Sequence, residues 1–371
     1  KIIVMSNQVK KFKIRNSKFI LGNTLEELKC LETESLDMIF CDPPYFLQLT
    51  KELRRPDMTV VKGVKETWDK FSSYKEYDEF TNLWLSECKR ILKKNGTIWL
   101  IGTYHNIYRL GFHLQNLNFW VLNDIIWNKV NPLPNFKGTR FTNAHEVLIW
   151  ATKSKKSKYT FNYHTMKKMN NDKQMRSDWN LKVCQGKERL KDSLNKTLHS
   201  TQKPEELLFR IILASTKQGD IVLDPFFGTG TTGAVCKKLG RKFIGIDNNP
   251  IYMHAAKRRI MKIKPIDTSV IEKIDTNNSS TKVPFSNLLK KGLIKPGEKI
   301  FNSRESIKAT VLSNGNLKFK KVEGSIHKVG AYVQNKPSCN GWTYWYVRQN
   351  NKVISINDHR NFLREATSSS E

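Results

Sequence analysis

A short apolar run that stops at Asp42-Pro43-Pro44-Tyr45 constrains this chain more than any other stretch. The run, Met38 to Cys41, has the length of a strand buried on both faces. Proline has no N–H to donate to a sheet ladder, so the strand must end before Pro43. In an open α/β sheet, ligands bind at the carboxyl ends of the strands. The run therefore predicts an acid, a stiff turn and a tyrosine at the mouth of a site. A solvated Asp-Pro turn is the alternative.

A glycine-rich turn forms the second feature, within Gly219 to Thr232. Ile221 to Leu223 predicts a buried strand, and Gly228 and Gly230 fall in the turn before a helix, where glycine lets the backbone approach a ligand closely. No Gly-Lys-Ser/Thr follows, which excludes a phosphate loop. Asp247 ends the next strand, and an acid so placed can bind ribose hydroxyls. Together they predict an adenosine-type cofactor. Simple helix packing for the glycines and a helix N-cap for Asp247 are the alternatives.

The charge of the chain points to a polyanionic partner. Lys and Arg number 64 against 34 Asp and Glu, a net charge of +30. Residues 153–196 carry 13 basic and 4 acidic side chains with interleaved aromatics. Basic groups can hold phosphates and aromatics can stack on bases, so nucleic acid is expected. A merely solvated basic surface is the alternative.

Other classes are disfavoured by what the sequence lacks. No apolar run approaches the ~20 residues of a membrane-spanning helix, and the first residues lack the apolar centre of a signal peptide. The six scattered cysteines form no CxxC pair, which favours reduced thiols in a cytosolic protein over a zinc or disulfide framework.

Hydrophobic periodicity predicts alternating strands and helices before a polar linker at 264–282. The residues between 46 and 74 are predicted to form a long irregular loop, of the kind that often serves as a lid or binding loop. The predicted helices are 24–31, 76–94, one beginning at 204 and 248–263, and the predicted strands are 18–23, 38–41, 97–101, 121–127, 147–151, 221–223 and 243–246.

The tail from Val283 to Glu371 is predicted to be a separate small unit with 15 basic and 6 acidic residues. Asn314-Gly315 is typical of a hairpin turn. Gly341 to Val347, GWTYWYV, clusters four aromatics. These rings either contact DNA or form the core of the unit, and on a strand alternation would turn half of them inward.

Three motifs resemble those of β-class S-adenosylmethionine-dependent DNA amino-methyltransferases. Asp42 to Tyr45 resembles the catalytic motif, Asp224 to Thr232 the cofactor motif, and His199 to Pro204 (HSTQKP) a third signature. The catalytic motif comes first, which is the order of the β class. The chain is similar over nearly its whole length to the GANTC-methylating adenine enzymes, which include modification and cell-cycle-regulated methyltransferases. Its tail resembles the restriction-enzyme-adenine-methylase-associated domain, notably at Asn340 to Trp342.

The resemblance implies an α/β, Rossmann-like methyltransferase fold, with a mixed, mostly parallel seven-stranded sheet, a circularly rearranged motif order and a small α+β C-terminal domain. The implied organisation is a catalytic domain at 1–264, with a basic target-recognition insert at about 129–200. A linker at 265–282 and a DNA-binding domain at 283–371 follow.

The implied function is transfer of a methyl group from S-adenosyl-L-methionine to adenine N6 in duplex DNA, at GANTC, by base flipping. Asp42 favours adenine, whereas Ser at that position would favour cytosine N4. A cytosine-N4 enzyme and an RNA amino-methyltransferase are alternatives, and the intact Asp42 argues against a non-enzymatic DNA-binding module. A homodimer, a cognate restriction endonuclease and a cytoplasmic, nucleoid-associated location are expected.

The resemblance also assigns site residues. Asp42 and the Pro43 carbonyl accept the two N–H bonds of the target amine, and Tyr45 stacks on the flipped base. No metal is expected. The catalytic set is Asp42, Pro43, Pro44 and Tyr45. The cofactor set is Asn23, Asp42, Thr201, Lys203, Asp224, Phe226, Phe227, Gly228, Thr229, Gly230, Thr231 and Asp247. The DNA set is Arg54, Arg55, Asn135, Arg140, Asn143, His145, Lys155, Lys156 and Trp342.

Overall fold

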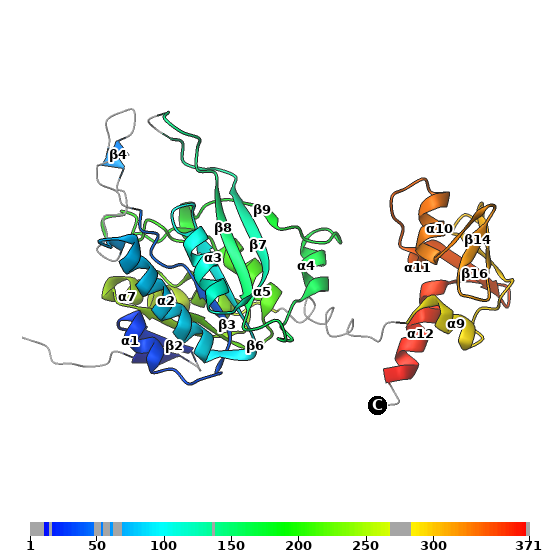
Figure 1. Cartoon of the computed structure of the whole chain (residues 1–371), viewed down its shortest axis with the longest axis horizontal. Coiled ribbons are helices and arrows are strands. Elements are labelled where there is room, and N and C mark those ends of the chain that lie inside the picture. Colours follow the sequence, from blue (N-terminus) through cyan, green and yellow to red (C-terminus); the bar gives the residue numbers. More distant parts are fainter. Residues whose placement is uncertain are drawn as a thin grey trace, which may run out of the picture. The chain divides into compact units, whose positions relative to one another are not determined.

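The computed structural model describes residues 11–14, 17–47, 53–54, 60–61, 69–135, 138–267 and 283–368. The chain divides into two compact units, Lys1–Asp275 and Thr276–Glu371. Each unit has a main sheet of its own, and its described core residues form two clusters in the first unit and one in the second. Figure 1 labels many of the helices and strands. Within the described ranges no helix is long and apolar enough to cross a membrane.

The first unit is built on one mixed sheet, in the order β1-β2-β11-β10-β3-β6-β8-β7-β9. The α/β fold with a mostly parallel sheet is confirmed, because five of the eight neighbouring pairs are parallel. Over the described residues the sheet has nine strands rather than seven, since β1 and β9 extend its two edges. The strands are β1 (Lys11–Ile14), β2 (Ser17–Leu21), β3 (Leu36–Cys41), β6 (Leu92–Gly102), β7 (Trp120–Lys129), β8 (His145–Thr152), β9 (Asp178–Leu181), β10 (Ile221–Asp224) and β11 (Lys242–Asp247). A separate two-stranded ladder pairs β4 (Leu53–Arg54) with β5 (Val60–Val61).

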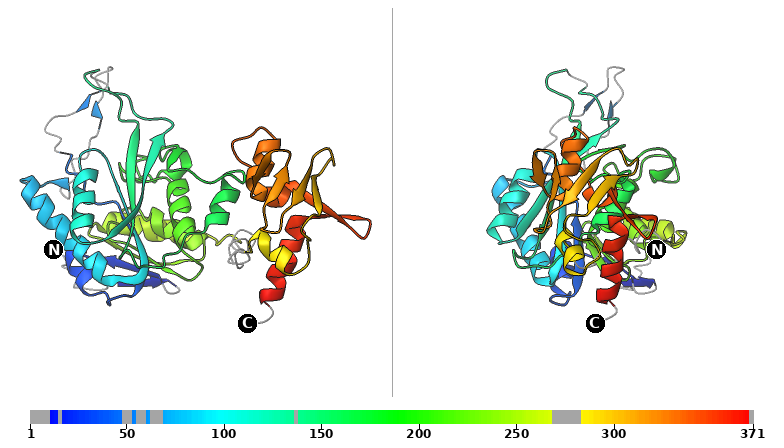
Figure 2. Two further views of the ribbon diagram at one scale, coloured as in Figure 1. Left: turned by 45° about the vertical axis from the view of Figure 1, so that its right-hand side comes forward. Right: turned by 90° about the vertical axis from the view of Figure 1, so that its right-hand side faces the viewer.

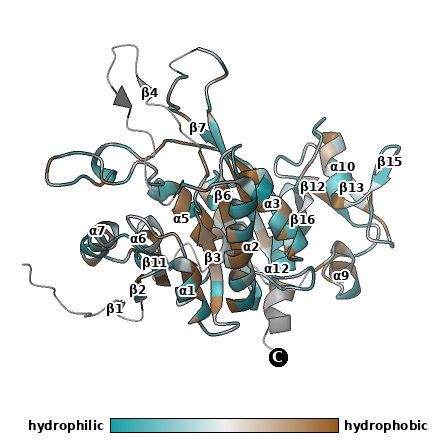
Figure 3. Ribbon diagram, turned by 60° about the vertical axis from the view of Figure 1, so that its left-hand side comes forward, coloured by the Kyte–Doolittle hydropathy of each residue, from teal (hydrophilic) through white to brown (hydrophobic). Residues whose placement is uncertain are grey.

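Helices cover both faces of this sheet (Figure 2). They are α1 (Thr24–Lys29), α2 (Tyr74–Ile91), α3 (Ile107–Asn116), α4 (Tyr163–Met169), α5 (Glu205–Ser215), α6 (Thr231–Lys238) and α7 (Pro250–Met261), with a 3₁₀ turn, η2, at Gly186–Glu188. One core packs α1, α2 and α3 against the sheet, and the other packs α4, α5, α6 and α7. In β3, Met38 and Phe40 enter the second core, while Ile39 and Cys41 enter the first. This burial on both faces explains the continuous apolar run, and Figure 3 colours β3 mainly as hydrophobic.

Parallel pairing gathers the carboxyl ends of four central strands at one edge of the sheet. Strands β3, β6, β10 and β11 run parallel to one another. Asp42 follows β3, while Asp224 and Asp247 end β10 and β11. Strand β8 runs antiparallel to β6, so its first residues lie at this edge as well. We call this the carboxyl edge, and the opposite one the amino edge.

The boundary between α2 and β6 differs from its prediction. The helix was expected at 76–94 and the strand at 97–101, but they span Tyr74–Ile91 and Leu92–Gly102. Ser73 caps the helix by accepting the Glu76 N–H, and the Glu76 carboxylate accepts the N–H of Ser72, the residue before the cap, which is a variant of the capping box. At the other end Leu92 pairs with Leu36 of β3, so strand pairing overrides the favourable helix propensity of the lysines that follow.

The second unit contains a six-stranded antiparallel sheet in the order β15-β14-β13-β12-β16-β17. Its elements are α9 (Phe285–Lys290), β12 (Lys299–Asn302), β13 (Lys308–Val311), β14 (Leu317–Phe319), β15 (Val322–Gly324), α10 (Ile326–Val333), α11 (Gly341–Tyr344), β16 (Trp345–Gln349), β17 (Lys352–Ser355) and α12 (Ile356–Ser368). The predicted hairpin joins β13 to β14, and Gly315 adopts a φ of 83° that favours glycine.

The aromatic cluster of the second unit is half buried. GWTYWYV spans the short helix α11 and the start of β16 rather than one strand. Trp342 and Trp345 belong to the core, whereas Tyr344 and Tyr346 are partly exposed. Trp342 retains 6% exposure, packs edge-on against Phe285 and is covered by Arg360 at 4.5 Å, so little of its ring is available to DNA.

Candidate functional site

The Asp-Pro-Pro-Tyr turn after β3 is held by hydrogen bonds from distant side chains. Tyr77 of α2 donates its hydroxyl to the Pro44 carbonyl at 2.8 Å. Asp69 accepts the backbone N–H groups of Phe46 at 2.7 Å and Leu47 at 2.9 Å. Phe46 has a φ of 53°, which is unfavourable for a residue with a Cβ, and these bonds hold it there. Neither Asp69 nor Tyr77 was singled out from the sequence, because nothing local marks their partners.

Asp42 lies half-buried at the carboxyl edge with both carboxylate oxygens engaged. Its Oδ2 accepts from the Lys203 ammonium at 2.7 Å, and its Oδ1 accepts from the Tyr45 hydroxyl at 2.9 Å. The Lys203 ammonium also lies 5.2 Å from the centre of the Tyr45 ring, in cation–π range. The structure thus brings together Asp42 and Lys203, which are 161 residues apart in the chain.

Glu146, at the start of β8, is a second carboxylate in this cluster that the sequence analysis did not identify. Its Oε2 accepts from the Tyr45 hydroxyl at 3.1 Å and lies 3.9 Å from the Lys203 ammonium. Its Oε1 pairs with Lys129 at 2.8 Å. The signal for it was its place beside His145, which the sequence analysis included in the DNA set.

The charges of the cluster act unequally on its two carboxyl groups. Burial raises the pKa of Asp42 above its ordinary value, although Lys203 opposes this. Burial acts the same way on Glu146, but Lys203 and Lys129 together lower its pKa below the ordinary value. Burial alone would lower the pKa of Lys203, yet Asp42 and Glu146 raise it. Asp42 is therefore the more basic carboxylate, because Glu146 has a second lysine of its own.

The glycine turn after β10 is fixed by two acids. Asp224 accepts from the Thr232 hydroxyl at 2.5 Å and from the Phe226 N–H at 3.0 Å. Asp247 accepts the backbone N–H groups of Gly228 at 2.7 Å and Asn249 at 2.8 Å. Burial raises the pKa of Asp224 to about 7 and that of Asp247 to about 6.

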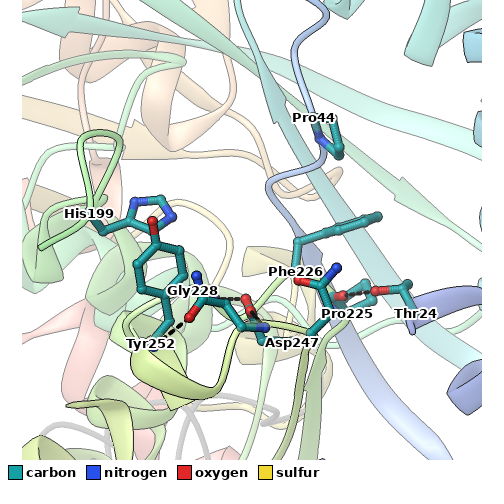
Figure 4. Close-up of a pocket in the computed structure, with 10 residues that line it drawn as sticks. Thr24, Pro44, His199, Pro225, Phe226, Gly228, Asp247 and Tyr252 are labelled. Atoms are coloured by element: carbon teal, nitrogen blue, oxygen red, sulfur yellow. Dashed lines mark hydrogen bonds between the residues drawn. The ribbon is translucent and has the colours of Figure 1, made fainter. Parts of the chain in front are cut away.

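Two adjoining pockets open along this turn and share His199, Phe226 and Gly228 among their lining residues. The first is lined by Thr24, Pro44, His199, Pro225, Phe226, Gly228, Asp247, Asn248, Asn249 and Tyr252. Figure 4 shows Phe226 between Pro44 and Pro225, with His199 and Tyr252 on the far side of Gly228. The second pocket reaches Asp42, Thr201, Lys203 and Asp224. The Asp247 carboxylate, which is suited to bind vicinal hydroxyls, thus lines the first pocket, and the Lys203 ammonium lines the second.

All predicted cofactor residues except Asn23 and Gly230 line these pockets. Phe226 to Thr229 and Thr231 line them, and Gly230 has the left-handed φ of 75° that lets the turn enter α6. Asn23 caps α1 by accepting the Leu25 N–H, and it is the adjacent Thr24 that lines the pocket. Lys203 faces Asp42 as well as the pocket.

The predicted DNA contacts separate into distinct places. Asn135, Arg140 and Asn143 lie between β7 and β8 at the carboxyl edge, and His145 is the first residue of β8 there. Arg140 donates to the Tyr104 hydroxyl at 2.7 Å.

Lys155 and Lys156 instead follow β8 at the amino edge, because Thr152 pairs with Thr97, the first residue of β6 to pair with β8. They line a separate pocket that also holds Trp120, and they are therefore remote from Asp42. Arg54 is in β4, without a described side chain, and Arg55 lies outside the described residues.

Comparison with known proteins finds two family matches along the chain. The model for DNA methylases matches residues 36–258, and that for Restriction Enzyme Adenine Methylase Associated domains matches residues 267–369. The Type II methyltransferase M.HinfI of Haemophilus influenzae is 50% identical over 339 residues, which cover 91% of this chain and 94% of that protein. The Type II methyltransferase M2.DpnII of Streptococcus pneumoniae is 45% identical over 240 residues, which cover 64% and 87%.

Among solved structures, the PvuII DNA methyltransferase (cytosine-N4-specific) superposes with a TM-score of 0.52. It is 20% identical and covers 71% of this chain and 92% of its own. At this identity the match establishes the shared fold.

Proposed function

The chain belongs to the DNA methylase family, as an adenine-specific enzyme that uses S-adenosyl-L-methionine, and we propose that Asp42 is its catalytic carboxylate and GANTC its target. The observation that carries this proposal is the position of Asp42, which shares one pair of adjoining pockets with the glycine turn and Asp247. GANTC is proposed from the similarity to the GANTC-methylating enzymes.

The residues of the two pockets fit the cofactor. Gly228 and Gly230 adopt left-handed backbone conformations that favour glycine. A Cβ on Gly245 would lie 2.4 Å from the Phe227 ring, so a larger residue there would displace the glycine turn from the Asp247 carboxylate. Asp247 would hold the ribose diol, and Thr201 with Lys203 would lie near the methionine carboxylate. When bound, the cofactor supplies an electrophilic methyl group on a sulfonium.

The protein groups act on the adenine amine. This amine is a poor nucleophile because its lone pair is delocalised into the ring. Asp42 and the Pro43 carbonyl accept its two N–H bonds, which orients the lone pair toward the methyl group. Burial raises the pKa of Asp42, which suits it to accept the proton that the amine releases. The amine is inside a duplex, so the base must be flipped out, and the ring of Tyr45 would lie against it.

Methylation of random duplex DNA, followed by nucleoside analysis and mapping of the modified positions, tests this function. The expected product is N6-methyladenine at GANTC. N4-methylcytosine, or methylation confined to RNA, would contradict the proposal. Methylation at another adenine site would overturn the target and leave the chemistry standing.

The proposed division of labour places catalysis in residues 1–264 and DNA binding in 283–371, joined by 265–282. Support comes from the family match of the tail and from its 15 basic and 6 acidic residues. Deleting residues 283–371 should lower DNA affinity and flatten its salt dependence, because fewer counterions are released. Cofactor binding should persist. A truncated enzyme with unchanged affinity and salt slope would contradict a DNA-binding role.

The biological setting is also a proposal. Similarity to enzymes named Type II methyltransferases supports a cognate restriction endonuclease acting on the same site. We propose a homodimer working on nucleoid DNA in the cytoplasm. Sedimentation with and without DNA tests the dimer, and a monomer in both conditions would contradict it.

A further inference from the structure

The cluster around Asp42 contains one more carboxylate than the proposed chemistry uses. Glu146 is 8% exposed and enters from β8, whereas Asp42 follows β3. The Tyr45 hydroxyl lies between them, at 2.9 Å from Asp42 and 3.1 Å from Glu146. A hydroxyl has one proton to donate, so Tyr45 can serve either carboxylate but not both fully at once.

Lys203 is shared in the same way. Its ammonium is 2.7 Å from Asp42 and 3.9 Å from Glu146, and its side chain is 7% exposed. Both donors of this cluster thus have a near partner in Asp42 and a second acceptor in Glu146. The other oxygen of Glu146 is held by Lys129 at 2.8 Å, so its free lone pairs are directed at Tyr45 and Lys203.

We propose that Glu146 is a positioning residue, which takes over the Tyr45 hydroxyl and the Lys203 ammonium when Asp42 turns to the adenine amine. The proposal rests on the proposed role of Asp42. Each oxygen of Asp42 already accepts one hydrogen bond in the structure, so an amine N–H competes with Lys203 and Tyr45 for this carboxylate. Without Glu146, a Lys203 ammonium that moved away from Asp42 would keep its contact with the Thr201 carbonyl at 3.3 Å but would have no paired carboxylate, which is strongly unfavourable for a buried charge.

Charge balance supports this hand-over. Asp42 and Glu146 carry two negative charges against the two positive charges of Lys129 and Lys203. Moving the ammonium between carboxylates leaves the net charge unchanged, and no group has to be brought in from water. A single carboxylate at Asp42 would still pair with Lys203 in the resting protein but would offer it no second carboxylate during the reaction.

Glu146→Gln tests the proposal, because it keeps the size of the side chain and removes its charge. The matched control is Asp37→Asn, which removes a carboxylate paired with Lys93 at the far end of β3. For each protein we would measure the single-turnover methylation rate at saturating duplex DNA and S-adenosylmethionine, the Kd for each, and the thermal midpoint.

The expected result is that Glu146→Gln slows the methylation rate by about 10- to 100-fold, with each Kd within about 3-fold of wild type. Asp37→Asn should leave the rate within about 3-fold. A Glu146→Gln rate close to wild type would overturn the proposal, as would a rate loss matched by equal losses in both affinities, which indicates a structural role.

Should Glu146→Gln not fold, Glu146→Asp keeps the charge and shortens the side chain. An intermediate rate with unchanged affinities would then support the proposal, and a wild-type rate would overturn it. Absence of adenine methylation by the wild-type enzyme would instead defeat the proposed function.

Discussion

The two edges of the sheet in the first unit carry the same kinds of ion pair in different surroundings. At the amino edge, Asp37 pairs with Lys93 and Glu34 with Lys153, and the more exposed partner of each pair is 43% and 37% exposed. At the carboxyl edge, Asp42 pairs with Lys203 at 17% and 7% exposure, and Glu146 with Lys129 at 10% and 14%.

The ion pairs at the two edges differ in burial and also in whether one lysine is shared between two carboxylates. Lys93 has one carboxylate at the amino edge, whereas Lys203 faces two at the carboxyl edge. A half-exposed pair contributes little to stability because water screens it. A buried, shared pair is held at a high desolvation cost, and such arrangements concentrate where perturbed groups are needed for chemistry. The comparison is consistent with a structural role for the pairs at the amino edge and with the proposed catalytic role of the cluster at the carboxyl edge.

The sharpest test of this contrast is removal of Asp42. Asp42→Ala should reduce turnover on the order of 1000-fold or more, because the carboxylate acts chiefly on the transition state. Binding of DNA and S-adenosylmethionine should be largely retained, as measured by calorimetry and filter binding. Asp37→Ala, at the other end of the same strand, is the control and should keep its turnover. Near wild-type turnover of Asp42→Ala would remove the assignment of the carboxyl edge as catalytic.

The two edges should also differ in stability when one lysine is removed. Lys203→Met leaves two buried carboxylates with one cation fewer, and should lower the free energy of unfolding by about 3 kcal/mol. Lys93→Met breaks a half-exposed pair and should cost less than about 1 kcal/mol. Urea titration followed by circular dichroism measures both. Equal losses would show that burial does not distinguish the edges.

A third test uses the pH dependence of cofactor binding at the carboxyl edge. Burial raises the pKa of Asp247 to about 6, so its carboxylate is charged above that pH and can accept the ribose hydroxyls strongly. Affinity for S-adenosylmethionine should therefore rise as the pH increases from 5 to 7 and then level off. Asp247→Asn should weaken binding by about 1–3 kcal/mol at pH 8 and remove the dependence.

His199 lines the same pocket, but burial lowers its pKa to about 4, so it stays neutral over this range. A dependence retained by Asp247→Asn would assign the titration to another group, with Asp224 the first candidate because its pKa is about 7.

The smallest expected effect concerns DNA. Arg140→Ala, at the carboxyl edge, should weaken DNA binding several-fold and reduce the salt slope by about 1 if it contacts one phosphate. Lys155→Ala with Lys156→Ala, at the amino edge, should change neither, since both lie away from Asp42. Equilibrium titration of fluorescent duplex DNA at several salt concentrations would measure this. A larger effect of the lysines would extend the DNA surface to the amino edge.

The sequence by itself determined the features that depend on neighbouring residues. The end of β3 follows from proline, which has no N–H to donate, and its two-sided burial from an uninterrupted apolar run. The glycine turn between β10 and α6 is likewise local. These features sufficed to predict an α/β sheet with Asp42 and Asp247 at one edge. They did not set the end of α2, where pairing of Leu92 with Leu36 competes with helix propensity.

Only the tertiary structure decided which charges meet at that edge. Glu146 reaches Tyr45 across 101 residues, and Lys203 reaches Asp42 across 161. Antiparallel pairing of β8 with β6 brings Glu146 into the site, and the same pairing carries Lys155 and Lys156 to the opposite edge. Strand direction is set by the whole sheet rather than by residues near Glu146 or Lys155. Burial is equally non-local, and because it contributes to the pKa of each carboxyl group, the proposed division of roles between Asp42 and Glu146 depends on the folded protein.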